Sequence, residues 1–303
     1  MTGAARRISR AALALSIAAL ATVAARPVGA SDAAPSERAP ATEVNKRLTD
    51  PTSTTWSLKL ENDVEFLDLE GHGTHAQNLL KFQPTMPVVL SGSLKLITRP
   101  EFTLLDDKPY VSAQGDVRRT TGVGDTVLDV VLSPRSNPWI LGLGPTWVFP
   151  TANLDQTGQG TWQAGPGSVA GYRGEHWLAG VIEQQWWSFA GAADRKAVSQ
   201  MHLQYIASWF FADGWSVGTS PTIKFDWRAA PGDQVTFPFG LSVAKVVKFG
   251  DALPVKFQVQ GLYVPVRPHD GPQAIIELYV IPVIPSLIAG PVFGAPSAPG
   301  EAW

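Results

Sequence analysis

The stretch GWSVGTSPTIKFDWR, residues 214–228, sorts its side chains by the parity of their positions. Most odd positions are large and apolar: Trp215, Val217, Ile223, Phe225 and Trp227. The even positions are small or polar: Ser216, Gly218, Ser220, Thr222, Lys224 and Asp226. A helix does not sort its side chains by parity, whereas a β-strand alternates strictly. The stretch therefore predicts a strand with two unlike faces.

The same alternation recurs along the chain and predicts about twelve strands, an even number, as single-chain bacterial barrels have. Most of these segments contain about ten residues, which at barrel tilt crosses the apolar band of an outer membrane. The predicted strands are 56–61, 78–90, 94–104, 125–132, 139–149, 162–172, 176–189, 201–211, 215–227, 235–249, 255–263 and 276–280. The expected fold is all-β, a transmembrane antiparallel up-and-down β-barrel over residues 54–284.

The N-terminus predicts export. Arg6, Arg7 and Arg10 precede an apolar run at 11–25, and small residues lead to Ala30, so we expect a signal peptide over residues 1–30 with cleavage after Ala30. Residues 31–53 are rich in Ala, Pro, Ser and charge, and predict a flexible periplasmic leader. Residues 285–303 form a C-terminal tail rich in Pro, Ala and Gly.

Composition narrows the class of protein further. The chain has no cysteine and a net charge of −2, so neither a disulfide scaffold nor a basic nucleic-acid surface is expected. No segment after the signal offers an uninterrupted apolar run long enough for a helical membrane span. A soluble β-sandwich also alternates, but export, strand length and tryptophan content favour the barrel.

The links between predicted strands alternate between tight turns and longer polar loops. Tight turns fall near 90–92, 134–138, 173–175, 213–214 and 250–252. Longer links fall near 64–76, 105–121, 151–161, 190–199, 228–234 and 266–272. Periplasmic turns of such barrels are short and extracellular loops are long. Both termini are therefore expected in the periplasm.

Tryptophans gather near the predicted strand ends, where an indole has one dry face and one hydrogen-bonding edge at the headgroup level. The residues assigned to these aromatic girdles are Trp56, Trp139, Trp147, Trp162, Trp177, Trp186, Trp187, Trp209, Trp215 and Trp227.

Several ordered motifs resemble a known family. They are LLKFQPTMP at 79–87, GVGDT at 122–126, LGPTWVFPTA at 143–152, GTWQAGP at 160–166 and WSFAG at 187–191. In this order the chain resembles the outer-membrane transporter family named for the meta-pathway of phenol degradation. The resemblance implies a barrel linked to uptake of aromatic or other hydrophobic small molecules. Such barrels usually end on an aromatic residue of the last strand, whereas here the tail runs on to Trp303.

The parity of each strand assigns a set of polar side chains to the interior. One interpretation is structural, with opposite charges pairing across a narrow interior and stiffening the wall. The other is a polar constriction through which a solute passes, and the nearly balanced charges argue against strong ion selectivity. The predicted lumen-lining residues are Lys59, Glu61, Lys95, Arg99, Glu101, Asp125, Asp129, Glu183, Gln185, His202, Gln204, Lys224, Asp226, Lys256, Gln258, Gln260 and Glu277. Asp125 also has an alternative interpretation as a turn cap after the glycines of 122–124.

Metal binding and catalysis are disfavoured. His72 and His75 have a spacing that two metal ligands can share, but only Asp68 and Glu70 lie nearby and no cysteine is present. Catalysis by a barrel hydrolase needs a serine activated by a histidine on the outer wall. His72, His75, His176 and His269 fall in predicted loops or turns, and His202 points inward by parity, so no histidine lies on the outer wall beside a serine. We therefore expect no enzyme activity, no cofactor and no metal.

The sequence as a whole predicts a passive channel or transporter for small solutes, aromatic or hydrophobic ones among them, in the outer membrane of a Gram-negative cell. The alternative is a plugged structural or receptor-like barrel that acts through its extracellular loops. The expected partners are outer-membrane lipid, a small-molecule solute and the barrel assembly machinery, with no nucleic acid.

Overall fold

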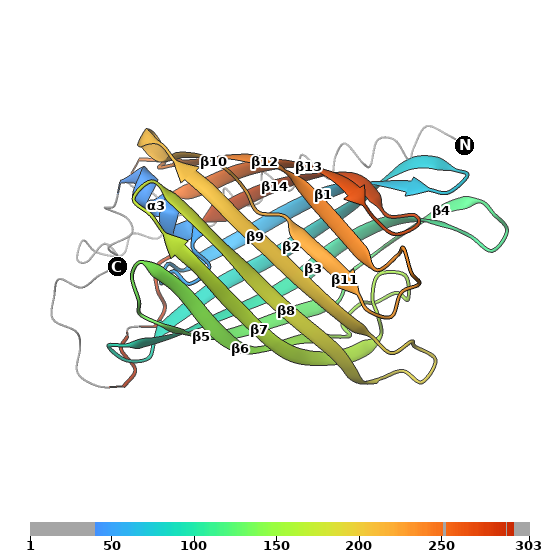
Figure 1. The fold of residues 1–303 in the computed structure, drawn as a ribbon, viewed down its shortest axis with the longest axis horizontal. Helices are drawn as coiled ribbons and strands as arrows, with labels where there is room; N and C mark the ends of the chain where they lie inside the picture. The colour runs from blue at the N-terminus through green and yellow to red at the C-terminus, as the bar shows by residue number, and fades with distance from the viewer. Residues whose placement is uncertain (1–39, 251–252, 289, 294–303) are drawn as a thin grey trace. The chain divides into compact units, whose positions relative to one another are not determined.

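A computed structural model describes residues 40–250, 253–288 and 290–293 of the chain. The signal peptide predicted for residues 1–30 and the terminal Trp303 lie outside these residues. Within them, no helix is long and apolar enough to cross a membrane. Nearly all of the regular structure is β-strand (Figure 1).

In the part of the chain that the structure describes, fourteen strand segments form one antiparallel sheet. The sheet closes on itself because β1 pairs with β14 over Leu60–Leu67 and β12 pairs with both β11 and β13. The segments are β1 (Ser57–Leu69), β2 (Gly73–Val89), β3 (Leu94–Val111), β4 (Val117–Gly122), β5 (Thr126–Pro134), β6 (Trp139–Phe149), β7 (Thr161–Arg173), β8 (Trp177–Gly191), β9 (Ser199–Phe210), β10 (Trp215–Thr219), β11 (Thr222–Asp226), β12 (Val235–Val247), β13 (Val255–Val266) and β14 (Pro272–Pro282).

Two barrel strands are each interrupted once, so the segments make a closed barrel of 12 strands. β4 and β5 both pair with β3 and are separated at 123–125. β10 and β11 both pair with β9 and β12 and are separated at Ser220–Pro221, where proline offers no backbone N–H to the ladder. The predicted fold class and strand number are confirmed.

The ends of the barrel differ in the links that join the strands. At one end, the turn end, the links are 90–93, 135–138, 174–176, 211–214 and 248–254. At the other end, the loop end, they are 70–72, 112–116, 150–160, 192–198, 227–234 and 267–271. The predicted long links 64–76 and 105–121 are wrong in extent, because β1–β2 and β3–β4 continue as hairpins through most of both. The β3–β4 hairpin projects beyond the neighbouring strands (Figure 1).

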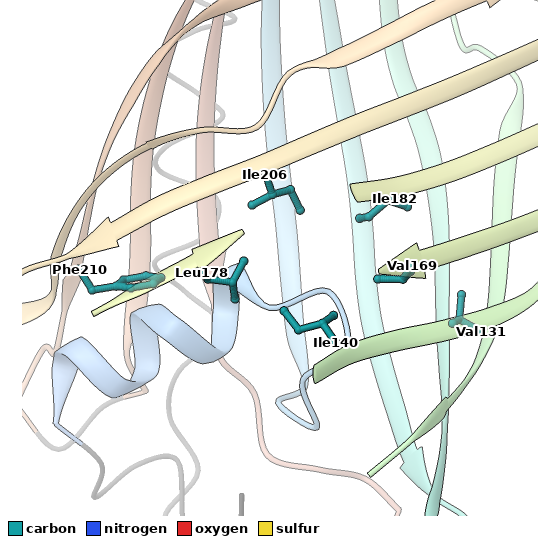
Figure 2. Close-up of a cluster of buried hydrophobic side chains, with 7 residues drawn as sticks. All are labelled: Val131, Ile140, Val169, Leu178, Ile182, Ile206 and Phe210. Carbon is teal, nitrogen blue, oxygen red and sulfur yellow. The ribbon is translucent and has the colours of Figure 1, made fainter. Parts of the chain in front are cut away.

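The two faces of the wall follow the predicted alternation. Large apolar side chains are exposed on the outer face, where lipid would contact them. Examples from β6, β8, β9 and β12 are Leu143, Trp187, Trp209 and Leu241. The inner face carries most of the polar side chains and two apolar clusters. The smaller is contributed by β13 and β14: Leu262, Val264 and Ile275. The larger is contributed by β5 to β9: Val131, Ile140, Val169, Leu178, Ile182, Ile206 and Phe210 (Figure 2).

Two tryptophans do not belong to the girdles. Trp186 is 1% exposed and faces the lumen, where its indole N–H donates to Thr146 Oγ1 at 3.1 Å. Trp56 is buried and donates to the carbonyl of Pro87 at 2.7 Å. Both indoles have their hydrogen-bond partner within the protein and need no headgroup.

The N-terminal leader corrects another prediction. Residues 31–53 were expected to be flexible throughout, but Ala41–Thr49 forms a helix, α3, that packs against the barrel. Val44 is 1% exposed and forms an apolar cluster with Val246 and Val283, with Leu48 packed against it. The helix is short, and its stability comes from this burial rather than from its length.

Candidate functional site

The lumen holds most of the predicted lining residues. On most strands they share a parity with buried side chains and oppose the exposed apolar ones. On β11, Lys224 and Asp226 are themselves exposed, and the contact of Lys224 with Glu65 of β1 places it inside the barrel. The structure places inward Lys59, Glu61, Lys95, Arg99, Glu101, Asp129, His202, Gln204, Lys224, Asp226, Lys256, Gln258, Gln260 and Glu277. Asp226 lies at the loop end, beside the opening of the lumen.

Glu183 and Gln185 are placed on the wrong face by the sequence prediction. In β8 the even side chains are inside: Ile182 belongs to the larger inner apolar cluster, and Gln184 donates to Asp129 Oδ1 at 2.6 Å. Glu183 therefore faces outward, where its Oε2 accepts a hydrogen bond from Ser168 Oγ at 3.1 Å. Its neighbour Gln185 accepts one from an indole on the same outer face.

Asp125 acts as a cap, the alternative that its glycine-rich context suggested. Its two carboxylate oxygens accept the backbone N–H groups of Ala152 at 3.1 Å and Gln159 at 2.7 Å. These bonds fix loop 150–160 to the break between β4 and β5. The carboxylate is therefore committed to the loop rather than to a solute path.

A network of charges occupies the inner face of β1, β2 and β3. Lys81 Nζ lies 2.6 Å from Asp63 Oδ2 and 3.1 Å from Glu61 Oε1. Lys59 Nζ lies 2.6 Å from Glu61 Oε2 and 4.0 Å from Glu101 Oε2. Glu61 and Lys81 are direct cross-strand neighbours, which makes the pairing a consequence of register. These contacts support the structural interpretation of the charges.

Two smaller networks continue around the lumen. Asp129 accepts hydrogen bonds from Thr146 at 2.7 Å and Gln184, and lies 3.7 Å from Arg99 Nη2. On the neighbouring strands β13 and β14, Glu277 Oε2 accepts bonds from Gln260 and from the Tyr279 hydroxyl at 2.7 Å. Most carboxylates of the lining therefore have a partner inside the protein.

The N-terminal segment 41–55, which we call the plug, is bound to the turn end of the lumen. Asn45 is fully buried and donates through Nδ2 to the carbonyl of Gly214 and to Ser216 Oγ, both at 3.0 Å. Lys256 Nζ donates to Thr49 Oγ1 at 2.8 Å. These bonds join the plug to β10 and β13.

Arg173, at the end of β7, is the plug's charged anchor. Its guanidinium pairs with Asp50 and donates to Thr52 Oγ1 at 2.9 Å. It also donates to the carbonyls of Ser136 at 3.0 Å and Trp139 at 3.1 Å, which belong to the wall. One side chain thereby ties the plug to two turns of the barrel.

A cavity of ≈ 140 Å³ remains between the plug and the wall. It is lined from the plug side by residues that include Leu48 and Asp50, and from the wall by residues that include Lys59, Arg99 and Lys256. The lumen is therefore partly filled at the turn end, with polar groups around the remaining space.

Sequence reasoning missed the plug and several inner partners. Asp63 and Gln184 alternate in step with buried neighbours, a signal that would have marked both as inner residues. Val44 and Leu48 lie one helical turn apart, a spacing that would have marked an apolar helix face. The pairing of Asp50 with Arg173 joins residues 123 positions apart, and no local pattern announces it.

At the loop end two histidines join separate loops. His72 Nδ1 lies 2.8 Å from the carbonyl oxygen of Glu70, and Nε2 lies 2.7 Å from that of Gly115. These two hydrogen-bonding contacts raise the pKa of His72. Asp233 raises the pKa of His269 through a hydrogen bond and its charge, and the pKa of Asp233 is lowered in turn. Among the described residues, no group of three or more His, Asp or Glu side chains is arranged to hold a metal ion.

This geometry defines a transmembrane-type barrel with an apolar outer face, a polar lumen and an inserted N-terminal plug. Among solved structures, the chain is similar to the COG4313 outer membrane channel from Pseudomonas putida F1, with a TM-score of 0.56 and 17% identity over 78% of this chain and 98% of that one. At this identity the likeness establishes the fold alone.

More distant likenesses are to a bacterial polysaccharide outer membrane secretin and to a porin. The secretin shares 8% identity with a TM-score of 0.36, over 77% of this chain and 99% of that one. The porin shares 8% identity with a TM-score of 0.33, over 75% of this chain and 99% of that one. No family model and no curated protein matches the chain.

Proposed function

We propose that the chain is a passive outer-membrane channel for small solutes, including aromatic or hydrophobic ones. It conducts when the plug is displaced from the turn end of the lumen. The observation that carries this is the wall itself: a closed barrel with an apolar outer face and a polar, partly hollow interior. A closed sheet suits a lipid environment because its strands pair their backbone polar groups with one another and no edge strand is left exposed. The solved structure of similar fold is also described as an outer membrane channel.

The range of solutes is supported by fewer observations than the channel role. Resemblance to the phenol-degradation transporter family suggests aromatic or hydrophobic molecules. Two members of the larger inner apolar cluster, Ile182 and Ile206, line the cavity beside the plug, where such molecules could contact them. No histidine–serine pair is bonded in the described part of the lumen, and His202 instead contacts the ring of Trp186. We therefore propose transport rather than catalysis.

The second candidate is a barrel that stays plugged and acts through its loops. The observation in its favour is that the plug is held by several hydrogen bonds and an ion pair at the turn end. A plugged barrel would still need its loop end for recognition, and the hairpins β1–β2 and β3–β4 give that end a large surface.

Conductance in planar bilayers separates the two candidates. The full chain is compared with a variant lacking residues 41–55, each checked for barrel folding by heat-modifiable migration in gels. Measurable current or liposome swelling with the full chain supports the channel. Absence of both in the full chain and in the plug-deleted variant would rule the channel out.

A further inference from the structure

A second cavity, of ≈ 320 Å³, opens at the loop end of the lumen. Its inner part is one rung of the sheet, where Lys224 of β11 stands in register between His202 of β9 and Thr236 of β12. Its outer part is made by loops 227–234 and 267–271, with Asp233 and His269 among the lining. A cavity of this size accommodates a small organic molecule.

Three of the acceptor side chains around this cavity, those of Asp233, Asp226 and Gln200, each have a partner within the protein. Asp233 Oδ1 accepts the backbone N–H of His269 at 2.8 Å and contacts its ring. Asp226 Oδ1 accepts the backbone N–H of Arg228 at 2.9 Å. Gln200 exchanges hydrogen bonds with Gln159.

The donors of the inner rung, His202, Thr236 and Lys224, have fewer partners than these acceptors. Among the described residues, neither the ring nitrogens of His202 nor the hydroxyl of Thr236 has a hydrogen-bond partner. Lys224 has a single ionic contact, 3.7 Å from Glu65 Oε1, which is too long for a hydrogen bond. The side chain of Lys224 is 47% exposed. The inner rung of the cavity therefore offers its donors to accepting groups on a ligand.

The contact of Lys224 with Glu65 also crosses the lumen. Glu65 lies on β1 and Lys224 on β11, and β12, β13 and β14 separate these strands along the wall. The pair is thus a bridge over the lumen at the inner boundary of the cavity. A carboxylate at hydrogen-bonding distance from Lys224 would replace the longer contact with Glu65.

We propose that this cavity binds the carboxylate of a small organic monoanion, with Lys224 as its counter-ion and His202 and Thr236 as further donors. On binding, the ligand carboxylate replaces Glu65 as the partner of Lys224, and the Lys224–Glu65 bridge over the lumen opens. Asp226 at the rim disfavours a dianion, because its carboxylate would repel a second negative charge. The opening of the bridge rests on the proposed channel function, whereas the binding site does not.

Equilibrium binding of benzoate to the purified full chain, measured by calorimetry, tests the site. Benzyl alcohol serves as a neutral analogue of the same shape. Lys224→Met should weaken benzoate binding by about tenfold or more, the loss expected for one charge-assisted hydrogen bond. Glu65→Gln removes the competitor and should tighten binding by about threefold. The matched control is Lys245→Met, a lysine whose ammonium lies over the Trp215 ring at the turn end.

Each outcome decides the proposal. Tighter binding of benzoate than of benzyl alcohol, lost in Lys224→Met and kept in Lys245→Met, supports it. Equal binding of the two probes, no binding of benzoate, or unchanged binding in a folded Lys224→Met barrel overturns it, and so does weaker binding in Glu65→Gln. Benzoate binding without any current would overturn the channel alone, and current without benzoate binding would overturn the site alone.

Discussion

Replacing Arg173 with alanine should release the plug and raise the open probability of the barrel. Arg173 is the one residue of β7 that pairs with the plug in the described structure, through Asp50 and Thr52. The Asp50 side chain is 7% exposed, so the substitution leaves a largely buried carboxylate without its counter-ion. The plug would then lower its free energy by moving Asp50 into water.

The size of the effect follows from these contacts. A hydrogen bond to a charged group contributes about 1.5–3 kcal/mol, and the 24% exposure of Arg173 favours the lower half of that range. A loss of about 2 kcal/mol increases the displaced population about 30-fold, provided that this population starts small. Asn45, Thr49 and Val44 still hold the plug, which limits the change.

Single-channel recording in planar bilayers measures the open probability directly. Lys46→Ala is the control on the same segment, because Lys46 donates to the carbonyl of Glu175 at an exposed site and such contacts contribute at most about 1 kcal/mol. Arg173→Lys keeps the charge but loses the fork geometry, and should fall between the two. A folded Arg173→Ala barrel whose open probability equals that of the unaltered protein would refute the role of this anchor.

Three further changes test the wall and its loops. Lys81→Met leaves the buried carboxylate of Asp63 without its counter-ion, whereas Glu61 keeps Lys59. The substitution should lower the free energy of unfolding by about 3–5 kcal/mol in urea titrations, with partial recovery on adding Asp63→Asn; no loss would contradict the network. Glu183→Leu removes a carboxyl group from the outer face and should stabilise the barrel in lipid by up to about 2 kcal/mol, and a loss of stability would show that this carboxyl group is structural. His269 has a raised pKa and Asp233 a lowered one, so their ion pair persists from the lowered pKa of Asp233 up to the raised pKa of His269. It is lost as pH falls through the first of these values or rises through the second. Hydrogen exchange in loop 227–234 should follow that profile, and His269→Ala should flatten it.

The wall was predictable from sequence because a strand repeats every second residue. One parity facing lipid must be apolar over the whole crossing, and this requirement marks the other parity as the lining. β11 and β13 obey it without exception at the predicted positions, and Lys224 and Gln260 point inward as expected. The closing of the sheet into a barrel follows from the same alternation, because most strands have one apolar and one polar face.

The prediction failed in β8 because both of its parities carry large apolar side chains. Val181 and Trp187 share one face, and Ile182 and Trp186 share the other. Assigning the polar Glu183 to the interior was then a choice between similar faces. The register with β7 and β9 decides it, since Glu183 stands beside Ser168 and Leu203. Such register is a tertiary property that one strand does not encode.

The contacts that close the two ends of the lumen differ in strength, and this difference predicts which end limits passage. At the loop end the bridge is a single ionic contact at 3.7 Å, between a partly exposed lysine and Glu65. At the turn end the plug is held by buried hydrogen bonds of Asn45 and by the ion pair of Arg173. If solutes pass through the lumen, release of the plug is the slower step. Flux in liposomes should therefore rise more in Arg173→Ala than in Glu65→Gln, and the opposite order would place the barrier at the loop end.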